Sequence, residues 1–187
     1  MTPPVKLIHT RRFEDSRGWF LETWSQARWH AQGVTEQFVQ DNHSLSKPAG
    51  TVRGIHFQRP PVAQGKLIRC ARGRILDVAV DLRLGSPTYG HHVATELSAE
   101  NGDQVWIPVG FGHGFVTLDA DTEVMYKVTA PYAPEAEGGI RWDSPELGID
   151  WRLPAEGPAL SPKDAVLPGF AEFDSPFSYD GEPLQPL

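Results

Sequence analysis

Seventeen prolines and eighteen glycines interrupt the apolar segments of this 187-residue chain. The runs that remain are too short for long helices but long enough for β-strands. The apolar runs also follow one another without the intervening helices that a parallel sheet requires. The pattern therefore predicts an all-β fold, an antiparallel sandwich or barrel with a few short helices.

Two stretches show this pattern most clearly. The sequence GKLIRCARGRILDVAVDLR predicts a hairpin whose strands, 66–70 and 75–82, are joined by a turn around Gly73. The stretch 103–130 predicts three further strands, separated by one turn with proline and glycine and another with two aspartates. The strands of both stretches are expected to contribute to the same barrel.

The chain is expected to form one domain, 1–187, with a core of about 15–165 and an irregular tail, 166–187. Two short helices are expected, one at 26–31 and one that begins near Ser161 in the sequence LSPKD. The tail is rich in proline, phenylalanine and aspartate, which favours irregular packing over the surface.

Composition narrows the classes of function. The formal net charge is −7, so sequence-independent binding of nucleic acid is not expected. No apolar run approaches the roughly 20 residues that span a bilayer, and the first residues lack the apolar core of a signal peptide. The single cysteine, Cys70, excludes an intrachain disulfide and favours a cytoplasmic location. A small anionic ligand is compatible with this charge, because a few local cations suffice to bind it.

A metal site is the first possibility raised by the histidines. The sequence GDQVWIPVGFGHGF ends with His113 at the spacing G-x5-P-x-G-x2-H, which resembles the second motif of the cupin superfamily of small jelly-roll barrels. Metal-binding cupins add an earlier motif with H-x-H and a glutamate. Around His56 the sequence is GIHFQ, without a second histidine, and the adjacent His91 and His92 would face opposite sides of a strand. We therefore expect a metal-free barrel.

Acid–base chemistry is the second possibility. Proton abstraction beside a carbonyl needs a base with a partner that fixes its tautomer, and a cation or donor for the enolate oxygen. Inversion of a stereocentre also needs an acid on the opposite face of the carbon. The chain contains candidates for all four roles in His56, Asp164, Lys66 and Tyr126. Spacing alone does not select these four from other sets.

Segments spread over most of the chain identify a family resemblance. In order they read FVQDNHS, RGIHFQ, AQGKLIRCARGRILDVAVDLR, WIPVGFGHGF and LSPKDA, and this set resembles the dTDP-4-dehydrorhamnose 3,5-epimerase family. The resemblance implies a cupin-type antiparallel jelly-roll barrel and a cofactor-independent isomerase. Such an isomerase would epimerise C3 and C5 of dTDP-4-dehydro-6-deoxy-D-glucose through an enolate, giving dTDP-4-dehydro-L-rhamnose. The matched catalytic positions are His56 as base, Asp164 as its partner, Lys66 as enolate support and Tyr126 as acid.

The resemblance also implies substrate-binding residues and an assembly. Tyr132 matches the aromatic residue that stacks on thymine, and Glu137 matches a further contact. Relatives of this kind act as homodimers, often with exchanged N-terminal strands, so a homodimer is expected. The nucleotide and pyrophosphate contacts are expected from Arg17, Glu22, Gln40, Asp41, Asn42, Arg53, His113 and Lys163.

Three alternatives stay open on the sequence. The chain could epimerise only C3 or only C5, act as a metal-dependent cupin oxygenase, or bind a nucleotide sugar without turnover. One geometric condition also has to be met. On a regular strand Arg53 and His56 face opposite sides, so both can enter one pocket only if the chain is irregular near Gly54, as a bulge would allow.

Overall fold

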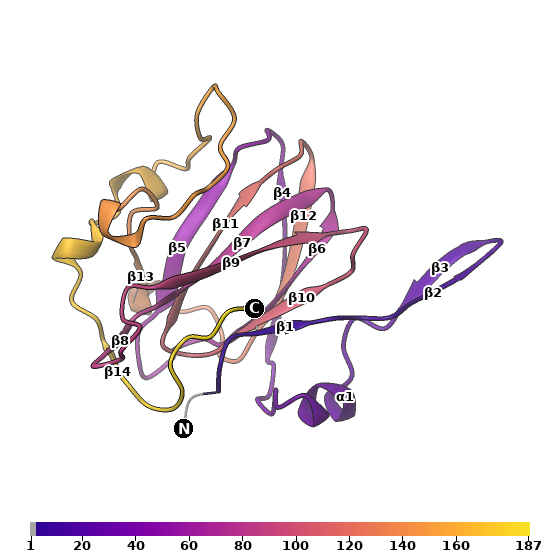
Figure 1. Cartoon of the computed structure of the whole chain (residues 1–187), viewed down its shortest axis with the longest axis horizontal. Coiled ribbons are helices and arrows are strands. Elements are labelled where there is room, and N and C mark those ends of the chain that lie inside the picture. The colour runs from indigo at the N-terminus through magenta and orange to yellow at the C-terminus, as the bar shows by residue number, and fades with distance from the viewer. Residues whose placement is uncertain (1–2) are drawn as a thin grey trace.

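Two five-stranded antiparallel sheets pack face to face in a computed structural model that describes residues 3–187 (Figure 1). The first sheet has the order β1-β10-β6-β12-β4, and the second has the order β13-β5-β11-β7-β9. The predicted cupin-type jelly-roll barrel is confirmed. The strands of the first sheet are β1 (Lys6–Ile8), β4 (Gln40–Ser46), β6 (Lys66–Arg72), β10 (Gln104–Ile107) and β12 (Thr122–Val128). Those of the second are β5 (Val52–Gln58), β7 (Arg74–Asp81), β9 (His92–Ser98), β11 (Phe111–Thr117) and β13 (Glu137–Gly139).

Short elements complete the chain. The strands β2 (Arg12–Asp15) and β3 (Gly18–Leu21) form a hairpin that projects from the body, and α1 (Gln26–Ala31) follows it as predicted (Figure 1). Near Ser161 the chain forms only the 3-10 turn η3 (Asp164–Val166). No helix within residues 3–187 is long and apolar enough to cross a membrane. The other elements are β8 (Arg83–Leu84), η1 (Pro134–Ala136), η2 (Pro145–Leu147), η4 (Phe170–Glu172) and β14 (Phe177–Ser178).

The predicted hairpin at 66–82 is wrong, although both of its strands exist. Strand β6 pairs with β10 and β12 in the first sheet, whereas β7 pairs with β11 and β9 in the second. The turn at Gly73 (φ +74) therefore carries the chain from one sheet to the other. The physical reason lies in β7, whose residues after Arg74 are buried on both faces. Such a strand has to occupy a position inside a sheet that is covered on both sides.

Three apolar clusters explain this burial. The inner cluster lies between the sheets and includes Ile68 of β6, Ala79 of β7 and Val124 of β12. A second cluster, on the outer face of the second sheet, joins Val78 of β7 to residues of the segment after β13, such as Trp151. The third lies outside the first sheet, where Trp29 of α1, Val34, Leu67 and Trp106 pack together. Each sheet is therefore covered on both faces over part of its area.

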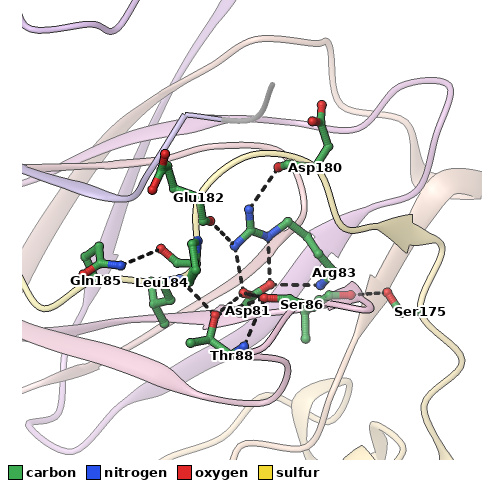
Figure 2. A network of polar contacts seen from close by, with 11 residues as sticks. Asp81, Arg83, Ser86, Thr88, Ser175, Asp180, Glu182, Leu184 and Gln185 are labelled. Carbon is green, nitrogen blue, oxygen red and sulfur yellow. Dashed lines mark hydrogen bonds and ion pairs between the residues drawn. The ribbon is translucent and has the colours of Figure 1, made fainter.

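The C-terminal tail is more ordered than predicted. Strand β14 pairs with β8 in parallel, and Leu184 is buried in the inner cluster. A buried ion pair between Arg83 and Asp81 anchors this segment (Figure 2). The guanidinium donates to Asp81 Oδ1 and Oδ2 at 2.9 and 2.8 Å, and to the backbone oxygens of Asp180 and Glu182 at 3.2 and 3.0 Å. The tail is thus held by a charged pair that is fully enclosed.

Candidate active site

Strand alternation places polar side chains between the two sheets at one end of the barrel. On β6, Ile68 belongs to the inner cluster, and Lys66 lies two residues before it. On β12, Tyr126 packs against the same cluster, two residues after Val124. Because residues two apart share a face of a strand, Lys66 and Tyr126 both point inward. They line two adjoining cavities that also share His56.

An irregularity in β5 brings Arg53 and His56 to the same side. The pairing of β5 with β11 shifts register between His113 and Phe115, opposite the stretch that holds Gly54. Gly54 has φ +114, and a Cβ there would lie 2.6 Å from the His113 backbone oxygen, so only glycine fits. Arg53 and His56 consequently line the same cavity, of about 280 Å³. The condition set by the spacing of these two residues is met.

His56 is held by a buried carboxylate. Its Nε2 lies 2.5 Å from Oδ1 of Asp164, and Ser161 Oγ donates to Asp164 Oδ2 at 2.8 Å. The Asp164 backbone N–H donates in turn to Ser161 Oγ at 3.0 Å. Burial alone would raise the pKa of Asp164, but the hydrogen bonds from His56 and Ser161 hold that pKa below its ordinary value. Asp164 is therefore ionised at neutral pH and fixes the orientation of the imidazole.

Lys66 and Tyr126 have perturbed acidities. Burial lowers the pKa of Lys66 to about 8, and the negative charges of Asp77 and Glu137 offset part of that effect. Burial also raises the pKa of Tyr126, so its hydroxyl keeps its proton at neutral pH. The cavity thus contains a cation close to its titration point beside a neutral proton donor.

Sequence reasoning missed Asp77, which lies on β7 and contacts His113 of the cavity lining. Its side chain is almost completely buried, and its Oδ2 lies 2.8 Å from Nε2 of His113. Asp77 shares its face of β7 with Ala79 of the inner cluster, so the carboxylate is inside the barrel. The available signal was a charged residue within an apolar run typical of a strand buried on both faces. Its negative charge contacts His113 and raises the pKa of Lys66.

The predicted nucleotide-binding residues form the other end of the site. Tyr132 is 54% exposed, and its hydroxyl donates to Glu137 Oε2 at 2.9 Å. Lys163 pairs with the same carboxylate through Oε1. Burial raises the pKa of Glu137, but the hydrogen bonds from Lys163 and Tyr132 outweigh it and keep the pKa below its usual value. Gln40 and Asn42 of β4 line the same cavity as Tyr132.

Three predicted substrate contacts lie elsewhere in this chain. Arg17 is in the turn of the projecting hairpin and pairs with Asp15. Glu22, just after that hairpin, pairs with Arg28 of α1. Asp41 pairs with Lys127 on the outward side of β4, because strand alternation sends it away from its neighbours Gln40 and Asn42. Within a single chain, every predicted site residue except these three therefore lines one of the two adjoining cavities.

The site as a whole suits proton transfer to and from carbon. One cavity is lined by a histidine paired with a carboxylate, by a buried ammonium group and by a neutral tyrosine. Arg53 and Lys163 add positive charge to the same lining. Paired guanidinium and ammonium donors suit a phosphate-bearing ligand. Among residues 3–187 there is no group of three histidine, cysteine or acidic side chains placed to hold a metal ion.

Comparison with known proteins agrees with this chemistry. A family model described as dTDP-4-dehydrorhamnose 3,5-epimerase matches residues 2–172. A relative of that name from Sinorhizobium fredii is 53% identical over 176 residues, covering 94% of this chain and 89% of the relative. A Salmonella typhimurium relative of the same name is 49% identical over 167 residues, covering 89% and 90% of the two chains.

Solved structures give the same result. The structure of dTDP-6-deoxy-D-glucose-3,5-epimerase from Legionella pneumophila, in complex with dTDP-4-keto-L-rhamnose, superimposes with a TM-score of 0.90. It is 44% identical, and the match covers 95% of this chain and 94% of that one. A 3'-monoepimerase from Streptomyces bikiniensis in complex with dTDP-quinovose is also similar, with a TM-score of 0.82 at 31% identity over 91% and 85% of the chains. With a family model that spans most of its length and relatives near half identity, this chain belongs to the dTDP-4-dehydrorhamnose 3,5-epimerase family.

Proposed function

We propose that this chain epimerises C3 and C5 of dTDP-4-dehydro-6-deoxy-D-glucose to give dTDP-4-dehydro-L-rhamnose. The observation that carries the proposal is the shared position of His56, Lys66 and Tyr126, which line both adjoining cavities. C3 and C5 both flank the C4 ketone of this substrate. One base, one oxyanion support and one acid can therefore serve both carbons, with a ring flip between the two steps.

The first half of each step is proton abstraction by His56. Asp164 engages Nε2, so Nδ1 is the nitrogen left to accept a proton. The carbon–hydrogen bond breaks, its proton passes to the imidazole, and its electron pair moves into the enolate. The ammonium group of Lys66 stabilises the negative oxygen, while the Asp164 carboxylate stabilises the imidazolium.

The second half is reprotonation from the opposite face by Tyr126. Its O–H bond breaks as the new carbon–hydrogen bond forms, and the ketone is restored. The raised pKa of Tyr126 supports this role, because the group must be protonated when the enolate forms. His56 then loses its proton, and Tyr126 regains one from solvent, so the enzyme ends each step in its starting state.

The remaining contacts divide between the two ends of the substrate. Arg53, His113 and Lys163 are proposed to hold the pyrophosphate, which their position in one cavity supports. Tyr132 is proposed to stack on thymine, with Gln40, Asn42 and Glu137 beside it. We further propose that the whole chain acts as one cytoplasmic catalytic domain.

A homodimer would account for Arg17 and Glu22. In the hairpin that precedes Glu22, the side chains of Phe13, Trp19 and Phe20 are 47%, 57% and 67% exposed. A projecting hairpin with this much apolar surface is typical of an interface. We propose that it packs on a second copy of the chain and supplies Arg17 to that copy's cavity.

Complementation between two inactive variants tests this arrangement. In a mixed dimer of His56→Asn and Arg17→Ala chains, one cavity combines an intact His56 with an intact Arg17 of the partner subunit. Co-expression is therefore expected to restore activity that neither variant shows alone. If Arg17 acts within its own chain, both cavities of the mixed dimer keep one defect and no activity returns.

Proton NMR in heavy water tests the reaction itself. Incubation of dTDP-4-dehydro-6-deoxy-D-glucose with the protein is expected to replace hydrogen by deuterium at both C3 and C5. Exchange at one carbon alone would favour the alternative, an epimerase acting only at C3 or C5, which the similarity to a 3'-monoepimerase supports. Absence of exchange in the folded protein would refute both.

A further inference from the structure

Three glutamine side chains hold the segment 130–133, which contains Tyr132. Gln58 Nε2 donates to the Pro131 oxygen at 3.2 Å, and its Oε1 accepts from the Ala133 N–H at 2.9 Å. Gln64 Nε2 donates to the Ala130 oxygen at 2.8 Å. Gln40 Oε1 accepts from the Tyr132 N–H at 2.9 Å. Four consecutive residues are thus each fixed through the backbone by a side-chain amide.

Gln58 and Gln40 are themselves held in place. Gln58 is 3% exposed, and its Nε2 also donates to the Val62 oxygen at 2.7 Å, so the amide is fully engaged. Gln40 Nε2 donates to Asn42 Oδ1 at 2.9 Å. Because buried amides with satisfied donors and acceptors resist rotation, the segment they bind is rigid.

The result is an exposed aromatic ring on a fixed backbone. The Tyr132 ring is more than half exposed, while its hydroxyl is tied to Glu137. A ring held in this way can stack on a planar base without paying the entropy of ordering a loop. We propose that Gln58 and Gln64 are positioning residues that hold segment 130–133 so that Tyr132 can accept the base of the nucleotide. This rests on the proposed function and adds two residues to its base-recognition end.

The two glutamines act on binding, not on proton transfer. Gln58 lies two residues after His56 on β5, but its amide bonds go to Val62 and to segment 130–133. Neither glutamine has a hydrogen bond with His56, Lys66 or Tyr126 among the described contacts, and His56 is held by Asp164 instead. Loss of either amide should therefore raise KM and leave kcat close to its original value.

Two variants that keep side-chain size test the proposal. Gln64→Met removes one hydrogen bond, and Gln58→Met removes three. Titration calorimetry with dTDP is expected to show Kd raised roughly three- to tenfold for Gln64→Met, from the net value of one hydrogen bond, and more for Gln58→Met. The Kd for inorganic pyrophosphate, which is bound by the other end of the site, is expected to stay within about twofold in both variants.

A matched control separates positioning from general stability. Thr122→Val also removes a buried side chain's hydrogen bond to the backbone, from Thr122 Oγ1 to the Asp119 oxygen at 2.8 Å, but in a turn outside both cavities. The Thr122→Val variant should lose thermal stability, but its Kd for dTDP should stay unchanged. If Gln64→Met folds and binds dTDP as tightly as the wild type, the inference is refuted. This variant alone is a sufficient test if Gln58→Met does not fold. If the wild type itself binds no dTDP, the proposed function fails as well.

Discussion

Replacement of Asp77 by asparagine would test how the barrel controls the charge of Lys66. Asp77 is a buried carboxylate whose negative charge raises the pKa of Lys66 against the effect of burial. Asparagine has the same shape, and its amide oxygen can still accept the hydrogen bond from His113. The substitution therefore removes a charge with little change in packing. Lys66 should then lose its proton at a lower pH.

The size of the effect follows from the pKa of Lys66. With a pKa of about 8, about three quarters of the ammonium form remains at pH 7.5. Loss of a nearby opposite charge lowers such a pKa by about one unit or more, which leaves about a quarter at pH 7.5. If only protonated Lys66 supports the enolate, kcat/KM falls about threefold at pH 7.5 and about tenfold at pH 9. At pH 6 the wild type and the variant converge, because Lys66 is protonated in both.

The assay is kcat/KM measured from pH 6 to 9.5. Tyr126 titrates above this pH range, because burial raises its pKa. The variant keeps Glu137, which is the other negative charge that raises the pKa of Lys66. Asp119→Asn is a matched control, since this carboxylate pairs with Arg74 outside the cavities and its loss should leave the profile unchanged. If kcat/KM of Asp77→Asn falls by the same factor at every pH, the carboxylate acts through its shape alone and the reasoning is refuted.

Three further substitutions have expected outcomes. Arg83→Met leaves Asp81 buried without its partner and should lower the free energy of unfolding by about 3–5 kcal/mol in urea titration, with dTDP affinity retained. Gly54→Ala should cost about 2 kcal/mol or more in the same titration, because φ is +114 and the new Cβ would contact the His113 backbone oxygen. Tyr126→Phe keeps the base but removes the acid, so turnover should fall about 100-fold or more, while NMR still detects deuterium exchange at the abstracted position. Retained turnover in Tyr126→Phe would remove that residue from the mechanism.

The sequence predicted those features that depend on neighbouring residues. The spacing of Arg53 and His56 required an irregular strand at Gly54, and the register shift there meets that requirement. The short apolar runs between prolines and glycines predicted the strands themselves. Ser161 caps the backbone N–H of Asp164 as expected, although the turn that follows is a short 3-10 segment.

Features that depend on distant partners could not be predicted in this way. A turn at Gly73 looks the same whether the chain returns to its own sheet or crosses to another, so the pairing of β6 and β7 was predicted wrongly. The contacts of Asp77 and Gln58 depend on His113 and on segment 130–133, which lie far along the chain. Asp41 belongs to a matched family segment, but the direction of its side chain is set by the pairing of β4.

The inner cluster has a consequence for how the protein is made. Val5 and Leu184 both pack into it, although they lie near opposite ends of the chain. A ribosome releases the chain from the N-terminal side, so Leu184 is among the last residues to emerge, and the cluster that Val5 joins is complete only when nearly the whole chain has been released. The barrel interior is then completed after translation, and an incomplete nascent chain exposes apolar strands to the cell.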